Sequence, residues 1–440
     1  MTNPTTSVRE PARDTPVLAE TDVLVVGGGS AGVAAAVAAA RAGAQVVLAE
    51  RYGSLGGLAT GGLIVLLLTL DDGLGRPVIA GLCEEITQRM RAAGGAHFPS
   101  PEHWGSDEAS LVDRYAHWGL IWGGGGSRRV RYSVAYDPEV MRSLFNEMVS
   151  EAGVELLFHL WGADALLSDG VLEGVAFQTK AGRRAVRARI VIDASGDGDI
   201  LQSAGVPQEL ERIHPWLWYR AGGIDMEAAR EAGGAFFRTV HPGQALFPWG
   251  GAARLDRKID PTDPVDLSQA EIACRGLVMQ EFARVRAEVA GMRDAHLCGI
   301  ATQLGVTESR RLVGLHVLTR AEMNRDFDDA IAITGHWTRA GDVYAIPYRS
   351  LLCHEHPNLM AAGRHISVDH RTHNATKEIP ACIATGQAAG IAARLALDCG
   401  GDLRKVEVAR LRAALRQTGA LLDYPFDPAR SAGGASQTEV

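Results

Sequence analysis

The sequence predicts an α/β fold with a mostly parallel sheet and a second domain inserted into the chain. Residues 23–26 are an apolar run, which is typical of a strand buried on both faces. A glycine cluster follows, and an alanine-rich helix then runs to Gly43, a residue suited to end it. A second strand over residues 45–50 completes the start of a β-α-β unit. Strand, glycine and helix signals return at residues 358–397, so one domain is predicted to form from separate pieces.

The glycine cluster carries the strongest functional signal. Gly27, Gly29 and Gly32 form Gly-x-Gly-x-x-Gly between a strand and a helix. The first glycine permits a tight turn, the second lets the backbone approach a diphosphate, and the third allows helix and strand to pack closely. Glu50 ends the next strand, where a carboxylate accepts hydrogen bonds from a ribose diol. The pattern predicts a dinucleotide site without distinguishing FAD from NAD.

Bulk properties exclude several classes of protein. The chain has 440 residues, 46% of them hydrophobic, and a formal charge of −8, which disfavours nucleic-acid binding through phosphate neutralisation. Its six cysteines contain no Cys-x-x-Cys pair, which favours a reducing compartment and a cytoplasmic location. The apolar run at 63–68 is too short to span a membrane, and the first 20 residues lack the apolar core of a signal peptide.

The remaining elements follow from periodicity and turn signals. Residues 137–151 have the spacing of an amphipathic helix, and the strands after them turn at 168–170 and 180–182. The last of these strands, 188–193, ends at "DASGDGD". Helices are expected at 267–290, 309–324 and from Pro380 to about residue 397. The segment 117–132 contains four successive glycines and is expected to be a mobile loop.

These signals predict a discontinuous organisation of the chain. We expect a nucleotide-binding domain made of residues 21–100, 137–205 and 355–426. Residues 101–136 and 206–354 would form an inserted α+β substrate or cap domain. Residues 1–20 and 427–440 are polar and are expected to be flexible tails.

An ordered set of motifs resembles one family. Glu50 with "GGLATGG", then "IVIDASGDGD", "ESRRLVG", "IPYRSLL", "AAGRHISVDH" and "GQAAG" resemble FAD-dependent oxidoreductases of the glutathione-reductase type, which are distant relatives of fumarate reductases. The resemblance covers most of residues 21–400 but not the middle, about 205–300. It implies a Rossmann-like FAD-binding domain with a parallel sheet and a β-meander. It also implies an isoalloxazine ring at the interface with the second domain.

The resemblance and the glycine motif together predict which residues hold FAD. They lie in the first turn, after the second strand, after the later strand and around the last helix: Gly27, Gly28, Gly29, Ser30, Ala31, Gly32, Glu50, Arg51, Gly56, Gly57, Leu58, Ala59, Thr60, Ala194, Gly196, Asp197, Gly363, Arg364, Pro380 and Gly386. The start of the last helix would stabilise negative charge on a reduced flavin. Gly386 has a second interpretation, close helix packing.

The absence of several motifs narrows the choice among flavin reactions. Residues 51–62 contain neither the cysteine pair of disulfide reductases nor a histidine for covalent attachment, so we expect non-covalent FAD. The Gly-Asp motif of aromatic hydroxylases is replaced by "AGRHIS". We therefore expect oxidation of a small organic molecule by hydride transfer to flavin N5, with O2 or a quinone as electron acceptor. The alternatives are a flavin monooxygenase and a non-catalytic escort protein on the same fold.

Several residues are candidates for the catalytic base. His370 is the first candidate, because it matches a family histidine and imidazole titrates near neutral pH. His365 and Tyr348 are the alternatives. Arg349 would either anchor a substrate carboxylate or form a structural salt bridge. Lys377 stands where the family more often has arginine, so its role is open.

Two further clusters have a structural and a functional interpretation. The histidines between residues 354 and 373 have spacings that occur by chance, so no metal site is predicted. Four tryptophans, Trp118, Trp122, Trp216 and Trp218, either line an aromatic pocket or pack in the core or at an interface.

Overall fold

The structure is a computed structural model, and it describes residues 8, 10–122, 128–251 and 254–426. The predicted tail 427–440, the four glycines of the 117–132 loop and most of the first ten residues lie outside this range. The prediction that residues 1–20 are a tail is wrong at its end. Strand β1 (Val17–Val26) already begins at Val17, because its first residues pair with the long strand β11 (Gly182–Asp193).

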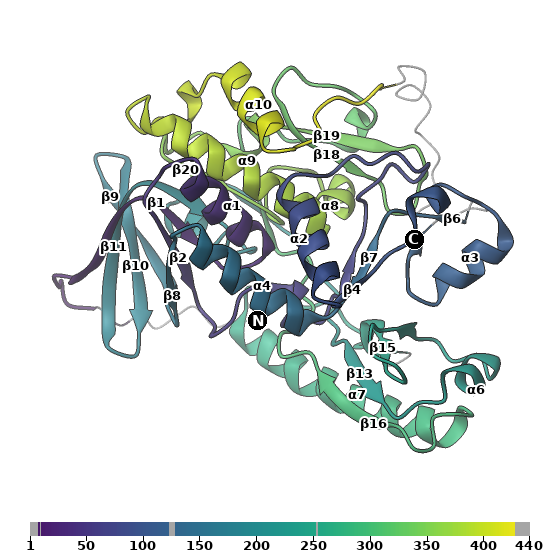
Figure 1. Cartoon of the computed structure of the whole chain (residues 1–440). Coiled ribbons are helices and arrows are strands. Elements are labelled where there is room, and N and C mark those ends of the chain that lie inside the picture. Colours follow the sequence, from purple (N-terminus) through teal and green to yellow (C-terminus); the bar gives the residue numbers. More distant parts are fainter. Residues whose placement is uncertain (1–7, 9, 123–127, 252–253, 427–440) are drawn as a thin grey trace.

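A seven-stranded mixed sheet forms the centre of the molecule, in the order β8-β2-β1-β11-β10-β9 with β20 paired to β11 (Figure 1). The strands β2 (Val46–Glu50), β8 (Glu155–Phe158) and β20 (Leu359–Ala361) join β1 and β11 in parallel register. The strands β9 (Trp161–Ser168) and β10 (Val171–Thr179) are antiparallel and form the predicted meander. The α/β fold with its Rossmann-like sheet is therefore confirmed.

Two helices packed against each other anchor this domain. Helix α1 (Ser30–Arg41) and helix α9 (Ile379–Leu397) lie in contact along their lengths. A Cβ on Gly386 would lie 2.1 Å from the carbonyl oxygen of Ala31, and one on Gly390 would lie 2.2 Å from that of Ala35. Only glycine fits at these two positions, so residues more than 350 apart in sequence are held as one unit.

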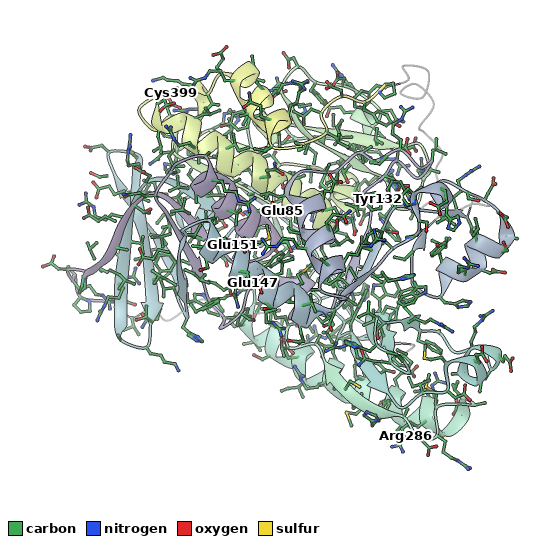
Figure 2. The ribbon with its side chains drawn as sticks, viewed as in Figure 1. Glu85, Tyr132, Glu147, Glu151, Arg286 and Cys399 are labelled. Atoms are coloured by element: carbon green, nitrogen blue, oxygen red, sulfur yellow. The ribbon has the colours of Figure 1, made fainter. Side chains whose placement is uncertain are left out.

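Helix α4 (Pro138–Glu151) confirms the predicted amphipathic helix. The Asp137 carboxylate caps its N-terminus by accepting a hydrogen bond from the amide of Glu139. Helix α4 packs beside α2 (Leu82–Ala92) and α1. Figure 2 shows Glu85, Glu147 and Glu151 close together on these helices. Arg89 bonds Glu151 at 2.6 Å and Arg41 bonds Glu85 at 2.6 Å. Exposed pairs of this kind contribute at most about 1 kcal/mol each, so burial rather than charge holds these helices.

A second sheet lies at the lower end of the molecule in Figure 1. It is antiparallel, in the order β14 (Phe237–Arg238), β15 (Ala245–Phe247), β13 (Tyr219–Gly222) and β16 (His296–Ile300). Helix α7 (Pro264–Glu288) confirms the helix expected at 267–290, and the side chain of Asp263 caps it. The short helix α6 (Met226–Glu231) lies at the edge of the same region. The domain boundaries drawn from sequence remain a prediction.

The prediction of a helix at 309–324 is wrong. This segment contains strand β17 (Arg310–Leu312), which pairs with β12 (Gln208–Leu210), followed by a loop. Arg311 is buried and forms ion pairs with Glu308 and Glu209, which fix an extended backbone. These tertiary contacts override the helical spacing of the local sequence.

The remaining strands and α-helices lie outside the two sheets described above. They are β3 (Leu66–Leu67), β4 (Ala96–His97), α3 (Ala109–Ala116), β5 (Ile121–Trp122), β6 (Arg129–Val130), β7 (Val134–Tyr136), α5 (Asp199–Ser203), β18 (Ala330–Gly335), β19 (Val343–Pro347), α8 (His370–Thr376) and α10 (Val408–Gln417). Within the described ranges, no helix is both long and apolar enough to cross a membrane.

Candidate active site

A cavity of about 970 Å³ opens at the carboxyl ends of the central parallel strands. Its wall includes residues that directly follow β1, β2 and β11, which is where ligands bind in open parallel sheets. The wall continues through the start of α9 to the loop before β13 and the start of α7. One cavity therefore touches pieces of chain from both sheets.

The glycine motif forms one end of this cavity. A Cβ on Gly29 would meet no atom within 4 Å, so this position faces open space. By contrast, a Cβ on Gly32 would lie 1.8 Å from the carbonyl oxygen of Gly27, which explains the third glycine by packing. Helix α1 has no side-chain cap at Gly29, and the amides of a first helical turn have no partners inside the helix. This end is shaped and polarised to accept a diphosphate.

Glu50 is held rigidly beside the glycines. Its carboxylate accepts hydrogen bonds from the amides of Gly28 at 2.6 Å and Tyr52 at 2.7 Å. Burial raises the pKa of Glu50, while these two amides and Arg51 oppose that rise. Each carboxylate oxygen has a further lone pair, so the group can still accept from a ribose hydroxyl.

Charged side chains surround the next part of the wall. Asp197 accepts from Arg364 at 2.8 Å and from the hydroxyl of Ser309 at 2.6 Å. Burial opposes ionisation of Asp197, but Arg364 and Arg51 prevail and lower its pKa. The Arg51 guanidinium lies over the rings of Tyr52 and Trp161, at 5.1 Å from each. These contacts fix the loop after β11 against the loop after β20.

Comparison with known proteins identifies the family. The family described as FAD dependent oxidoreductase matches residues 22–215 and 213–415, nearly the whole described chain. The chain belongs to this family. It is an oxidoreductase enzyme with FAD as its cofactor, which confirms the resemblance carried by the sequence motifs. The glycines, Glu50 and the long cavity fit that dinucleotide.

Individual relatives of this oxidoreductase are distant. Digeranylgeranylglycerophospholipid reductases 2 and 1 of Methanopyrus kandleri are 29% and 32% identical over 213 and 203 residues. These alignments cover 47% and 44% of this chain, and 46% and 45% of the relatives, so the chain matches about half of their length. A solved structure, a geranylgeranyl bacteriochlorophyll reductase-like protein of Thermoplasma acidophilum, has a TM-score of 0.47 at 13% identity. It covers 91% of this chain and 88% of its own.

Most of the predicted FAD residues line the oxidoreductase's cavity directly: Gly27, Gly29, Ser30, Ala31, Glu50, Arg51, Gly56, Gly57, Leu58, Ala59, Ala194, Gly196, Asp197 and Arg364. The rest stand behind this wall: Gly28, Gly32, Thr60, Gly363, Pro380 and Gly386. Gly28 bonds Glu50, Thr60 donates to the carbonyl of Leu55, and Gly386 packs against Ala31. Gly28, Thr60 and Gly386 themselves lie outside the set of residues that line the cavity.

The four predicted catalytic residues lie outside the residues that line the cavity. The Tyr348 hydroxyl donates to the carbonyl of Leu403 at 2.9 Å, and burial strongly raises its pKa. Arg349 forms two hydrogen bonds with Asp329, at 2.9 and 3.0 Å. This is the structural salt bridge that the sequence left open as the second interpretation of Arg349.

The two histidine candidates, His365 and His370, also lie outside the set of residues that line the cavity. His365 is fully buried, with Nε2 at 3.5 Å from Asp193, and burial lowers its pKa. The His370 side chain is about half exposed, and its Nδ1 lies 3.0 Å from Glu308. The geometry does not favour direct contact between any of these candidates and a substrate in the cavity.

The sequence analysis missed three acidic residues of the wall, Asp199, Glu271 and Glu378. Glu378 stands immediately before helix α9 and lines the cavity beside Lys377. The available signal was position alone, since Glu378 directly precedes the helix start marked by Pro380. Across the described chain, no cluster of three or more His, Cys, Asp or Glu is arranged to hold a metal ion.

Proposed function

We propose that this oxidoreductase oxidises a small apolar or aromatic molecule by hydride transfer to FAD. One observation carries the proposal: a single cavity joins the diphosphate-binding glycines to a wall of tryptophans. When bound, the isoalloxazine ring supplies a hydride acceptor at N5. The protein would hold the dinucleotide by Gly29, the first turn of α1 and Glu50. The tryptophan wall would orient the substrate.

The tryptophan wall comes from the second sheet region. Trp216, Trp218 and Trp249 all line the cavity, with Trp218 at 5.5 Å from Trp216 and 5.6 Å from Trp249 between ring centroids. Leu267 of α7 and Leu304 extend the apolar surface. Large aromatic faces of this kind bind flat or apolar molecules through burial of surface.

Trp249 has an unusual backbone. Its φ of +54° lies in the left-handed region, which is uncommon for a residue with a side chain. Such a conformation costs of order 1–3 kcal/mol and persists only where the surrounding structure enforces it. This strain supports a functional placement of the Trp249 ring at the cavity.

A second direction of the reaction is the alternative. Both Methanopyrus kandleri relatives are named as reductases, and the apolar wall suits reduction of an apolar substrate by the reduced cofactor equally well. The monooxygenase interpretation also uses such a cavity. Family membership and the complete glycine cradle disfavour the escort protein.

One anaerobic experiment separates these reactions. We would mix the FAD-loaded protein with a panel of small aromatic and apolar alcohols, amines and acids, without NAD(P)H, and follow flavin absorbance. Bleaching by one compound supports oxidation. Photoreduced protein that an apolar alkene reoxidises without O2 supports reduction. Incorporation of an O2-derived oxygen atom with NAD(P)H supports the monooxygenase, and overturns our proposal.

A change in the tryptophan wall should affect substrate and not FAD. We expect Trp216→Leu to raise KM for the substrate about tenfold or more, because part of its apolar contact is lost, while FAD affinity stays unchanged. Trp104→Leu is the matched control, since Trp104 stacks on Tyr132 outside the cavity wall. Equal kinetics for both variants would remove the tryptophan wall from substrate binding.

The location of the enzyme remains a proposal. All six cysteines are unpaired in the structure. Free thiols are typical of a reducing compartment, which supports the cytoplasmic location predicted from the sequence.

A further inference from the structure

Glu378 occupies a distinctive place in the cavity. It is the residue immediately before α9, and its neighbours Lys377, Ile379 and Cys382 line the same wall. Arg364, which contacts Asp197 from the loop after β20, lines the wall too. Glu378 therefore shares one cavity with the glycine cradle and with the tryptophan wall.

The Glu378 carboxylate has no hydrogen-bond donor among the described residues. It does not cap its own helix, although it stands at the capping position. The other acids of this wall are engaged. Glu50 accepts two amide hydrogen bonds, Asp197 is bonded by Arg364 and Ser309, and Asp199 is bonded by Arg310 at 3.1 Å. Glu271 pairs with Arg275 at 3.1 Å.

We infer that Glu378 is the catalytic residue that exchanges a proton with the substrate, an inference that rests on the proposed function. In the oxidation, the substrate loses a hydride from carbon to FAD and a proton from the adjoining oxygen or nitrogen to the Glu378 carboxylate. A C–H and an O–H or N–H bond would break, and a C=O or C=N bond, a carboxyl O–H and an N–H on FAD would form. The substrate loses two electrons and FAD gains them. In the reverse direction Glu378 donates the proton.

The charges around Glu378 suit this role. Burial raises its pKa to about 7, and Lys377 opposes the rise. Burial lowers the pKa of Lys377 itself. Glu378 and Glu308 oppose this shift, and Arg364 adds to it. Burial also raises the pKa of the Cys382 thiol to about 12, so this thiol stays neutral. An acid that titrates near neutral pH can both accept and donate a proton under working conditions.

The raised pKa gives a test that needs neither substrate nor FAD. The folded protein binds the Glu378 proton more tightly than the unfolded chain, whose pKa is near the ordinary 4.5. Relative to Glu378→Gln, the stability of the wild-type apoprotein should therefore fall as pH rises from about 4.5 to about 7. Urea unfolding of both proteins across this range measures the difference. A difference independent of pH would contradict the titration.

The deciding experiment measures the midpoint potential of bound FAD against pH. Reduction places added negative charge in the cavity, which raises the pKa of a nearby carboxyl group further. Above pH 7 the wild-type potential should therefore fall more steeply with pH than that of Glu378→Gln. Glu407→Gln is the matched control, because Glu407 also precedes a helix without capping it but is exposed outside the cavity wall. We expect it to follow the wild type.

The outcomes are distinguishable. A wild-type chain that takes up no FAD overturns the proposed function and this inference together. Identical potential curves for wild type and Glu378→Gln overturn the inference alone. Should Glu378→Gln lose FAD, Glu378→Asp retains a carboxyl group and should shift the break in the curve, and an unshifted break overturns the inference. With a substrate that bleaches the wild type, Glu378→Gln should reduce FAD about a hundredfold more slowly.

Discussion

Gly29→Val is expected to abolish FAD binding while the protein stays folded. The Cβ position of Gly29 meets no atom within 4 Å and opens into the cavity, so the valine side chain finds space there without disturbing the protein. Its φ of −67° and ψ of 179° are accessible to any residue. The two methyl groups would fill the approach of the diphosphate to the first turn of α1.

We expect FAD affinity to fall at least about a hundredfold, which corresponds to roughly 2.7 kcal/mol. Absorbance of the purified protein near 450 nm and calorimetric titration of the apoprotein with FAD measure this loss. Gly299→Val is the control, because Gly299 lies in strand β16, away from the cavity wall, and has the same free space around its Cβ position. Stoichiometric FAD in Gly29→Val would refute the cradle.

Arg131→Met is expected to cause the largest loss of stability. The side chains of Arg131 and Asp71 are almost completely buried, with 2% and 0% exposed, and Nε lies 3.2 Å from Asp71. Arg131 also donates to the carbonyl oxygens of His336 and Trp337, each at 3.0 Å. Methionine fills most of the volume but leaves a buried carboxylate without its cation, which costs about 3–5 kcal/mol.

Urea unfolding at pH 7 measures this loss. Burial raises the pKa of Asp71 and Arg131 opposes the rise, so removal of Arg131 raises it further. The penalty should therefore be smaller at pH 5, where more of the Asp71 carboxyl is protonated. Arg129→Met is the matched control. It removes a partly exposed ion pair with Asp107 near the same strand, worth at most about 1 kcal/mol. Equal losses in both variants would contradict the argument.

The sequence was most informative where local pattern and fold coincide. The strand, glycine turn and helix at 23–42 are continuous in the chain, so periodicity and glycine spacing predicted β1, α1 and the diphosphate end of the cavity. The helix expected at 309–324 failed for the opposite reason. Its conformation depends on Glu209, about a hundred residues away, which binds Arg311. No local pattern contains that partner.

The same distinction explains the site. Gly29 and Glu50 are recognised through their neighbours in sequence, whereas Glu378 is placed in the cavity wall together with residues from segments distant in sequence. His370 was favoured because of a motif match. The structure turns it toward Glu308 and leaves it about half exposed, information that no motif carries. The surroundings of a residue that come from distant segments are not predictable from sequence spacing.

The close contact of Gly386 and Gly390 with α1 has a mechanical consequence. The amides proposed to bind the diphosphate belong to α1, and Glu378 directly precedes α9; these two helices pack against each other. The separation between the first turn of α1 and the start of α9 is therefore set by the close packing of the two helices, and we expect it to stay the same when a substrate binds. We expect that adaptation to substrates of different size comes from the tryptophan wall, which belongs to the region of the second sheet. Differences in substrate among relatives of this enzyme are therefore expected to go with changes in the tryptophan wall rather than in the packed pair α1 and α9.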